Sequence, residues 1–566
     1  MFNHERQLYR IPTALLAICQ QATIRCLLPM LALSPLLFLV YWLLLGLLAV
    51  TLVAYRRVHW VWSAATWAAT TGVCGIGLLI WLGERLLLPL LVVLPRWSAM
   101  LPVPPWAWRM DEVAWGLSGL LMGMITAVCL TLWHTQDDTP GLPIFMLLLL
   151  LTGLATIWAD TLPSLMAGWL LLTAAWFTVL AAASSRNADG WSLRLKRVAW
   201  HLLALFGLWL VGILVSLNGS ESLVVGEGNP VVMTVVLLAV LVQMGVWPLH
   251  GWRPRHAPLP LPVAWLLNSV PPLLGVVTLV QLVVINEAAL DTSLAFTAVG
   301  LLGSLVGVVL LWRDLAQPER AVGWVALALA GQTFLVGLWG GVAALLAAVY
   351  GLVLATGILF LLAERPLPRP HPLWRYGWRL VAPLIAVGTV GAVPLLPGFV
   401  AQVQLYEGWL ENGAGVLLLF GMLLHLLLIT AVYQLIRGRE AETEGLPLAR
   451  PDKIDVAAGL LAVGLVINGR WAAITQLGQT HWLAWLTVLV TLAAAGVLSR
   501  FLKQEQLVWF SWREIVPLTE RAWWLLAQIV QVGRNGLAAL KDALLILEGE
   551  TGLLWLLALL LLLLLL

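Results

Sequence analysis

A histidine, His425, lies within the long apolar stretch Leu417–Ile436. An imidazole titrates near neutral pH, and an ionisable group at membrane depth is costly, so this position is a candidate for proton transfer. The alternative interpretation is a neutral imidazole that hydrogen-bonds a backbone carbonyl or a partner subunit. Because His425 is the single histidine of its stretch, the residues leave both interpretations open.

Other kinds of chemistry find no support in the residues. We find no recognisable Ser/His/Asp motif, no phosphate-binding glycine loop and no Cys/His spacing of a metal site. The longest basic loops, Arg365–Arg379 and Arg437–Lys453, are too short for a catalytic domain. We therefore expect no active site, no cofactor and no metal in this chain. The four cysteines are expected to act as small hydrophobic residues: Cys19, Cys26, Cys74 and Cys129.

The composition determines which elements position His425. Of the 566 residues, 61% are hydrophobic and 10% are charged, and the formal net charge is +3. Mean hydropathy is +0.95. Soluble globular chains carry about 25% charged residues, so a soluble enzyme, a disordered protein and a nucleic-acid binder are excluded. Many of the 33 tryptophans lie near the ends of apolar runs, as is typical of a membrane interface.

Apolar stretches of about 20 residues, the length that crosses a bilayer, recur along the chain. Because backbone groups in lipid must be paired within their own segment, these stretches predict helices. We predict an all-α, polytopic transmembrane bundle of about 16 spans. The spans are 31–54, 59–81, 112–133, 142–159, 161–183, 199–217, 230–249, 261–284, 291–312, 321–339, 341–363, 379–401, 413–436, 455–469, 480–501 and 552–566. The amphipathic segment 514–550 predicts a lateral helix before the final anchor.

Basic residues predict the orientation of the bundle. One set of alternate loops carries sixteen Lys and Arg residues, whereas the opposite loops between the sixth and fifteenth spans carry Arg470 alone. The positive-inside rule then places the basic loops in the cytoplasm of a cell whose inner (plasma) membrane holds the chain. The early loops are less regular, because Arg85, Arg96 and Arg109 fall on the predicted outer side.

A proline-rich, basic segment, Pro248–Pro262, joins two predicted spans. Prolines remove backbone donors and end or kink helices, and broken helices in transporters place free backbone groups beside a polar pathway. An ordinary cytoplasmic turn, which Arg253 and Arg255 also fit, is the alternative. The candidate residues of a broken helix or loop are Pro248, His250, Pro258 and Pro262.

Short stretches between residues 109 and 437 resemble, in order, those of one protein family. They are Arg109-Met110-Asp111-Glu112, Ala159-Asp160-Thr161-Leu162 with Gly168-Trp169, Trp247–Trp252 with Ala257–Val263, Arg320–Gly331, Pro397-Gly398-Phe399-Val400 and Thr430-Ala431-Val432-Tyr433. The set resembles the antiporter-like, proton-conducting subunits of respiratory complex I (NADH:quinone oxidoreductase), membrane-bound hydrogenases and multisubunit cation/proton antiporters. The resemblance implies N-terminal spans at 1–108, an antiporter-like core at 109–437, additional spans at 438–513, and a lateral helix with a terminal anchor at 514–566.

The resemblance implies a row of ionisable groups halfway through the membrane, but the matching positions here are neutral. Leu170 and Gln243 stand where the family has a glutamate and its partner lysine. Amides and hydroxyls do not titrate near neutral pH, so we do not expect the family's Glu–Lys pumping mechanism. A hydrated polar pathway remains an expectation, with the candidates Gln243, Asn268, Gln332, Thr356, Gln402, Gln404 and His425.

Three other titratable residues are interpreted without a pathway role. His134 and His201 lie at the ends of predicted spans and are expected at the membrane interface. Asp160 lies between two spans, where it is expected to cap the helix that begins at Leu162.

Three functional hypotheses follow. The first is an ion-translocating subunit of a larger redox or transport complex. The second is a structural subunit that kept the fold, lost the pump and anchors a catalytic partner. The third is the membrane component of a two-component inorganic-carbon uptake system. The expected partners are other membrane subunits of a hetero-oligomeric complex, a peripheral redox or metal-containing subunit, and lipid; nucleic acid is not expected.

Overall fold

The computed structural model describes residues 63–85, 88–93, 106–133, 142–183, 188–217, 230–250, 259–285, 294–363, 367–368, 373–437, 440–441, 453–476 and 480–501. The chain divides into two compact units, Met1–Ser499 and Arg500–Leu566, and the first is described below. The predicted spans 31–54 and 552–566 and the predicted lateral helix lie outside the described residues. The domain boundaries drawn from the sequence remain predictions.

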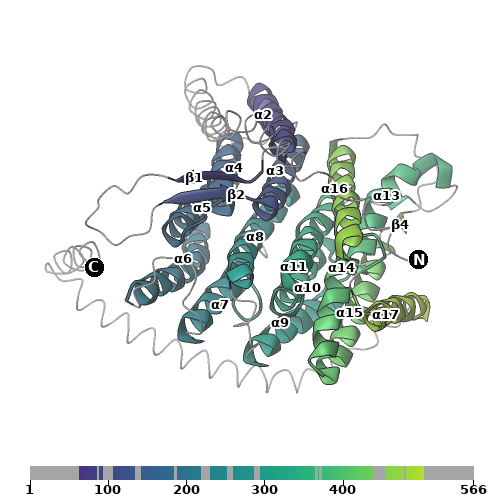
Figure 1. Ribbon diagram of the computed structural model, residues 1–566. Helices are drawn as coiled ribbons and strands as arrows, with labels where there is room; N and C mark the ends of the chain where they lie inside the picture. The colour runs from purple at the N-terminus through teal and green to yellow at the C-terminus, as the bar shows by residue number, and fades with distance from the viewer. Residues whose placement is uncertain are drawn as a thin grey trace, which may run out of the picture. The chain divides into compact units, whose positions relative to one another are not determined.

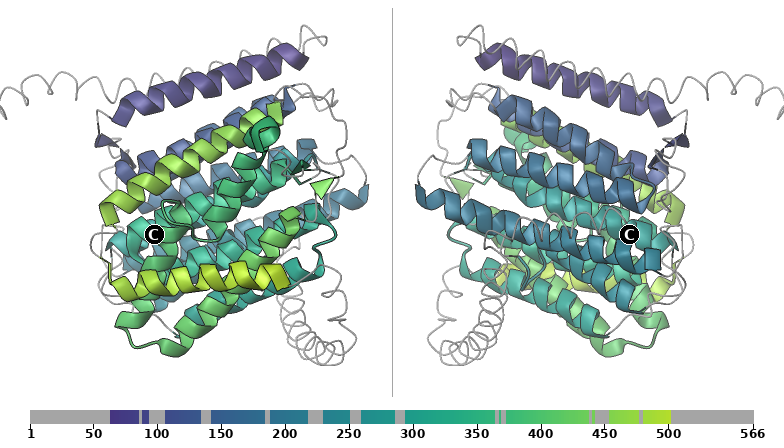
Figure 2. Two further views of the ribbon diagram at one scale, coloured as in Figure 1. Left: turned by 90° about the vertical axis from the view of Figure 1, so that its right-hand side faces the viewer. Right: turned by 90° about the vertical axis from the view of Figure 1, so that its left-hand side faces the viewer.

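The first unit is a bundle of apolar helices whose axes run side by side (Figures 1 and 2). Ten of the described helices are long and apolar enough to cross a membrane, and three apolar helical segments are shorter. The predicted fold class is confirmed, although the described residues do not fix the number of spans. The helices are α2 Ser63–Glu84, α3 Glu112–Leu132, α4 Leu142–Ile157, α5 Leu162–Ala183, α6 Ala188–Leu217, α7 Pro230–Met244, α8 Leu261–Ile285, α9 Leu294–Arg313, α10 Pro318–Trp339, α11 Gly341–Tyr350, α12 Thr356–Leu361, α13 Leu373–Val390, α14 Pro397–Glu411, α15 Gly415–Arg437, α16 Lys453–Gln476 and α17 Trp482–Phe501.

Burial differs from helix to helix, and this locates the core. In the membrane-spanning windows of α8 and α10, 100% and 94% of the residues are buried, against 28% in those of α6 and α17. A helix that is apolar all round is suited either to a protein core or to lipid. The centre of the unit is therefore built on α8 and α10, and α6 and α17 expose apolar side chains such as Phe206 and Val497.

Four short strands accompany the helices and were not predicted. β1 (Leu90–Val93) pairs antiparallel with β2 (Ala107–Met110), and β3 (Leu367–Pro368) pairs parallel with β4 (Glu440–Ala441). The backbone N–H of Arg109 also donates to the Trp158 carbonyl at 2.7 Å. Strands of two to four residues inside loops have too few positions to show an alternating pattern.

Asp160 does not have the predicted role of helix cap. Its carboxylate lies 3.1 Å from the Arg109 guanidinium. At the start of α5 the backbone N–H of Thr161 donates instead to the Ser164 hydroxyl at 3.1 Å, as in a capping box. Asp111 is the acidic cap of this region, since it accepts from the Ala114 N–H at 2.8 Å at the start of α3.

The predicted span 379–401 is two helices rather than one. α13 ends at Val390 and α14 begins at Pro397. Pro394 lies between them without an N–H to donate, and Ala392 and Leu395 have positive φ angles of 53° and 72°, which L-residues seldom adopt. Because the segment is apolar throughout, hydropathy alone could not show this break.

The predicted span 341–363 is also irregular. A π-helical segment, η2 (Gly351–Ala355), separates α11 from α12. The indole N–H of Trp265 on α8 donates to the carbonyl of Val353 in this segment at 3.0 Å. Such π-segments occur mostly as single turns and frequently mark functional sites.

Glycine allows α14 to start directly against the end of α13. A Cβ atom on Gly398 would overlap the carbonyl oxygen of Thr389, so no other residue fits without a shift of the backbone. Gly323 on α10 is different, because no atom lies within 4 Å of the position its Cβ would take.

We expect Gly398→Ala to lower the free energy of unfolding by about 1–3 kcal/mol, because two backbone segments must separate. Gly323→Ala is the matched control, and it is expected to stabilise by up to about 1 kcal/mol through higher helix propensity. Thermal unfolding of the purified chain in detergent measures both. Equal effects of the two substitutions would contradict the close α13–α14 contact.

Candidate functional site

Three clusters of buried polar side chains among the described residues involve histidines or predicted pathway residues. The first cluster joins His201 on α6 to Gln243 on α7, and the second joins Gln332 on α10 to Gln402 on α14. The third joins Tyr406 on α14 to His425 on α15. All of these side chains are buried, and in each cluster the partners come from different helices.

The first cluster contains a buried histidine, His201, four residues after the start of the apolar window of α6, Arg197–Leu214. His201 Nδ1 lies 3.0 Å from Gln243 Oε1, and because an amide oxygen only accepts, the imidazole donates this hydrogen bond. Trp176 meets the imidazole edge-on with ring centroids 4.6 Å apart. The Thr173 hydroxyl is buried and has no hydrogen-bond partner among the described residues.

These side chains surround a small cavity of about 10 Å³, which Pro271 of α8 also lines. Its lining is mostly apolar, but Thr173, His201 and Gln243 offer hydrogen-bonding groups, and a cavity of this volume has room for about one water molecule.

A proline explains why Trp176 points into this cluster. Pro271 lies inside α8 and has no N–H, so the carbonyl of Leu267, one turn earlier, receives no hydrogen bond from its own helix. The indole N–H of Trp176 donates to this carbonyl at 3.0 Å. The contact therefore fixes α5 to the irregular part of α8.

His201 was not predicted as a site residue. The sequence places it near the end of a span, and the apolar window of α6 does begin only four residues before it, at Arg197, although the helix itself begins at Ala188. The side chain is 1% exposed. The basic residues Arg194–Arg197 have the composition of a loop, and the signal that could have located His201 was the apolar run that follows it.

The second cluster brings together two predicted pathway residues. The Gln402 amide donates to Gln332 Oε1 at 3.2 Å. Both side chains line a cavity of about 30 Å³, together with Thr333 and Thr389. Gln402 lies in the second turn of α14, directly after the break that follows α13.

The third cluster joins three helices through His425. Its Nε2 donates to the backbone carbonyl of Val390 at 3.0 Å, and its Nδ1 lies 3.4 Å from the Tyr406 hydroxyl. Val390 is the last residue of α13, and the residue four positions later is Pro394, which has no N–H. The imidazole therefore pairs a carbonyl that a proline leaves without a helical donor.

Two other predicted pathway residues bond within their own helices. The Asn268 amide donates to the Ala264 carbonyl at 2.8 Å, and the Thr356 hydroxyl donates to the Leu352 carbonyl. The structure does not bring either of them into the three clusters. Gln404 faces a separate, larger cavity, and Leu170, at the family's glutamate position, is 51% exposed on the outside of α5.

The predicted break after α7 is present in part. α7 ends at Met244, and Gly245 has a positive φ of 64°. Pro248 is exposed, whereas His250 is buried with Nδ1 3.3 Å from the Pro248 carbonyl oxygen. Pro262 is the second residue of α8, and Pro258 lies outside the described residues.

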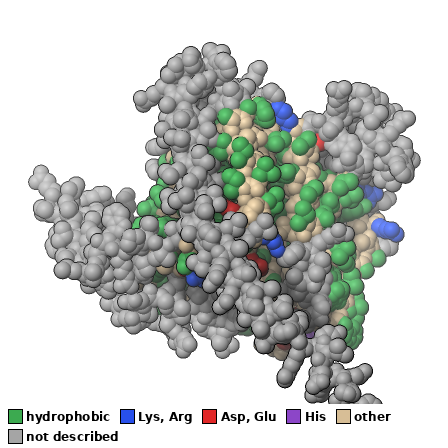
Figure 3. Space-filling view, turned by 45° about the horizontal axis from the view of Figure 1, so that its top comes forward, with side chains coloured by type: hydrophobic (Ala, Val, Ile, Leu, Met, Phe, Trp, Pro, Cys, Tyr) green, Lys and Arg blue, Asp and Glu red, His purple; other side chains and the backbone are tan. Residues whose placement is uncertain are grey.

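The larger cavity has a volume of about 860 Å³ and lies where the end of α2 meets the starts of α3 and α11. Trp81 and Trp115 stack in its wall with ring centroids 4.2 Å apart. On the face of the molecule in Figure 3, hydrophobic side chains cover most of the described surface and charged ones are few. The polar residues that line the cavity are Arg85, Glu112, Gln404, Glu407, Glu411, Asn468 and Thr480.

No protein-family model matches the sequence, and no curated protein matches it. Solved structures do match. A chain of respiratory complex I from Thermus thermophilus is 18% identical with a TM-score of 0.59, and the match covers 77% of this chain and 98% of that one. A chain of the membrane-bound sulfane sulfur reductase, an archaeal respiratory membrane complex, is 17% identical with a TM-score of 0.58 over 78% and 76%.

A chain of the Mrp complex from a Dietzia species is 15% identical, with a TM-score of 0.61 over 82% of this chain and 97% of that one. At these identities the likeness establishes the fold. The protein therefore shares the fold of chains from these three membrane complexes, and the resemblance found in the sequence is confirmed at the level of the fold.

Trp176→Phe is expected to destabilise the protein by about 1–3 kcal/mol more than Trp169→Phe. Both tryptophans are buried on α5, but Trp169 Nε1 has no hydrogen-bond partner among the described residues, so its replacement leaves no carbonyl unpaired. The two substitutions remove the same atoms, and thermal unfolding in detergent compares them. Equal destabilisation would show that the Leu267 carbonyl does not depend on Trp176.

Proposed function

We propose that this chain is a membrane subunit of a hetero-oligomeric ion-translocating complex and that protons pass through it by way of the three polar clusters. One observation carries the proposal: each buried histidine of the clusters lies near a proline that removes a backbone donor within or just after a neighbouring helix. His201 shares its cavity with Pro271, and His425 pairs the carbonyl that Pro394 leaves without a donor.

Imidazole is suited to this role because it accepts a proton on one ring nitrogen and releases one from the other. In the first cluster, Gln243 and a water in the adjoining cavity supply hydrogen-bonding neighbours for His201. In the third cluster, the Tyr406 hydroxyl supplies one for His425. The Gln332–Gln402 pair lies on a cavity of its own and offers a neutral relay.

This mechanism departs from the Glu–Lys pair that the family resemblance implies. Leu170 cannot hold a proton, and it faces away from the clusters. Imidazoles next to amides take the place of the charged pair, so the proposal needs no permanently buried charge. Among the described residues, no contact specifically favours the structural hypothesis or the carbon-uptake hypothesis.

The proposed setting is the inner (plasma) membrane of the cell, with the basic loops in the cytoplasm. The turn between α9 and α10 then faces the cytoplasm, and the 860 Å³ cavity opens on the outer side. The proposed partners are other membrane subunits and lipid, together with a peripheral redox or metal-containing subunit.

Replacement of either histidine by glutamine, which keeps hydrogen bonding but does not titrate, is expected to reduce proton flux at least about tenfold. The complex is purified through a tag on this chain and reconstituted into liposomes that contain a pH-sensitive dye. An imposed membrane potential then drives the flux.

Thr278→Val is the matched control, because this buried hydroxyl donates within its own helix to the Leu274 carbonyl and should leave the flux unchanged. Wild-type flux in both His201→Gln and His425→Gln would contradict proton conduction by this chain and favour a structural role.

The orientation is tested with single cysteines in a chain whose four native cysteines are replaced by serine. Asn412→Cys lies in the turn after α14, and Gln317→Cys lies in the turn before α10. A membrane-impermeant maleimide should label Asn412→Cys in intact cells, and should label Gln317→Cys only after the membrane is opened. The reverse pattern would overturn the assigned orientation.

A further inference from the structure

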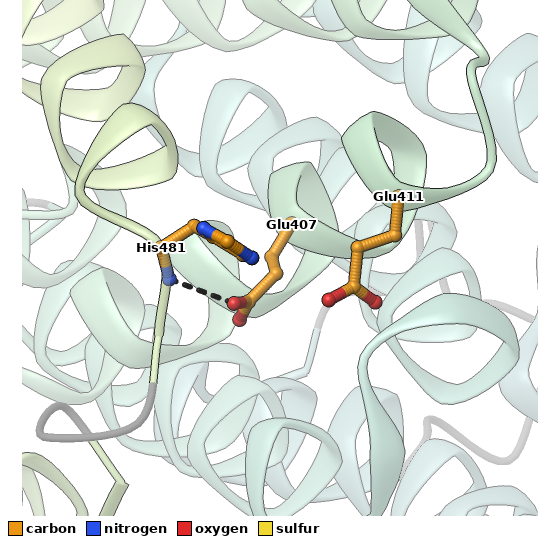
Figure 4. A group of neighbouring side chains, drawn as sticks. All are labelled: Glu407, Glu411 and His481. Carbon is orange, nitrogen blue, oxygen red and sulfur yellow. Dashed lines mark hydrogen bonds between the residues drawn. The ribbon is translucent and has the colours of Figure 1, made fainter.

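Two glutamates of α14 that line the large cavity lie close to a histidine that precedes α17, and all three side chains can bind metals. Glu407 and Glu411 lie one turn apart on α14, and His481 directly precedes α17 (Figure 4). Their ligand atoms all lie within 4.8 Å of one another. Atoms bound to one ion at about 2.1 Å stand about 3–4 Å apart, so small side-chain rotations complete such a site.

The two elements that carry these ligands are held together. The backbone N–H of His481 donates to Glu407 Oε1 at 2.8 Å, as the dashed line in Figure 4 marks. The rings of Phe399 on α14 and Trp485 on α17 meet edge-on with centroids 5.2 Å apart. The Trp485 indole also donates to Thr480 at 2.6 Å, which fixes the segment before α17. The imidazole is thus presented to the two carboxylates by contacts that do not involve a metal.

The electrostatics of this end of α14 favour a cation. Glu411 is the last residue of the helix, where the macrodipole is negative, and the last turn contains no basic residue. Two carboxylates this close repel each other as well. Among the described residues, neither Glu407 nor Glu411 forms an ion pair. A bound cation would offset both the repulsion between the two carboxylates and the unfavourable interaction of Glu411 with the negative end of the helix dipole.

We propose that Glu407, Glu411 and His481 bind a divalent transition-metal ion of the zinc class. One imidazole nitrogen and two carboxylate oxygens form a donor set that suits such ions, whereas Ca²⁺ and Mg²⁺ prefer oxygen ligands throughout. The metal joins α14 to α17 and completes its coordination with water from the cavity. No sequence motif predicts this site, because His481 is 70 residues away from the nearer glutamate.

Zinc binding to the full chain in detergent tests the proposal, using protein that carries no polyhistidine tag and has been stripped with a chelator. Competition with a fluorescent zinc indicator gives the affinity. The wild type should bind one Zn²⁺ tightly, and excess Mg²⁺ or Ca²⁺ should not displace it. Glu411→Gln and His481→Ala should each weaken binding about tenfold or more.

Glu112→Gln is the matched control, since this carboxylate lines the same cavity outside the cluster and should bind zinc like the wild type. Glu411 and His481 are exposed, and gel filtration checks that their variants remain folded. Absence of zinc binding by the wild type overturns the proposal. The proposal is also overturned if the wild type and all three variants bind zinc with equal affinity. It is likewise overturned if Glu112→Gln weakens zinc binding as much as Glu411→Gln and His481→Ala do. The measurement does not involve proton flux, so its outcome is independent of whether the proposed function is correct.

Discussion

The pairing of backbone carbonyls that prolines leave without a donor is the constraint on which this bundle depends. In lipid, an unpaired backbone group costs several kcal/mol, so each proline break needs a side-chain donor from elsewhere. The Trp176 indole donates to the carbonyl of Leu267, four residues before Pro271. The His425 imidazole donates to the carbonyl of Val390, four residues before Pro394. These two contacts join α5 to α8 beside the first polar cluster, and α15 to α13 within the third.

The scarcity of charge takes on a specific meaning in this arrangement. Where the family resemblance implies buried carboxylates and ammonium groups, this chain has neutral side chains. Gln243 and Gln402 pair with side chains of other helices, whereas Asn268 and Thr356 bond backbone carbonyls one turn earlier. A neutral network avoids the desolvation cost of buried charge and still allows imidazole to exchange protons. The charged groups at the large cavity, in contrast, lie at an end of the bundle, where a metal ion can reach them.

The sequence was sufficient to predict the helices and several of the buried polar residues, but it did not predict the breaks and π-helical segment within the predicted spans. The apolar stretches predicted the fold class, and Gln243, Gln332, Gln402 and His425 do lie in the buried clusters. The break at 391–396 was missed because hydropathy alone defined the span; Pro394 and Pro397 were the signal that could have located it. His201 was missed because a basic run precedes it. The Glu407–Glu411–His481 group depends on contacts between distant segments, which spacing along one chain cannot show.

Proton flux through the complex in which His201 and His425 are both replaced by glutamine tests the central claim most directly. The helix contact of His425 is retained in part by the glutamine amide, so the assembly can be purified and compared with the wild type at equal protein in liposomes. We expect flux through the double variant to fall to that of liposomes without protein. Flux equal to that of the wild type would contradict this result, because no imidazole would then remain in the clusters to carry the proton.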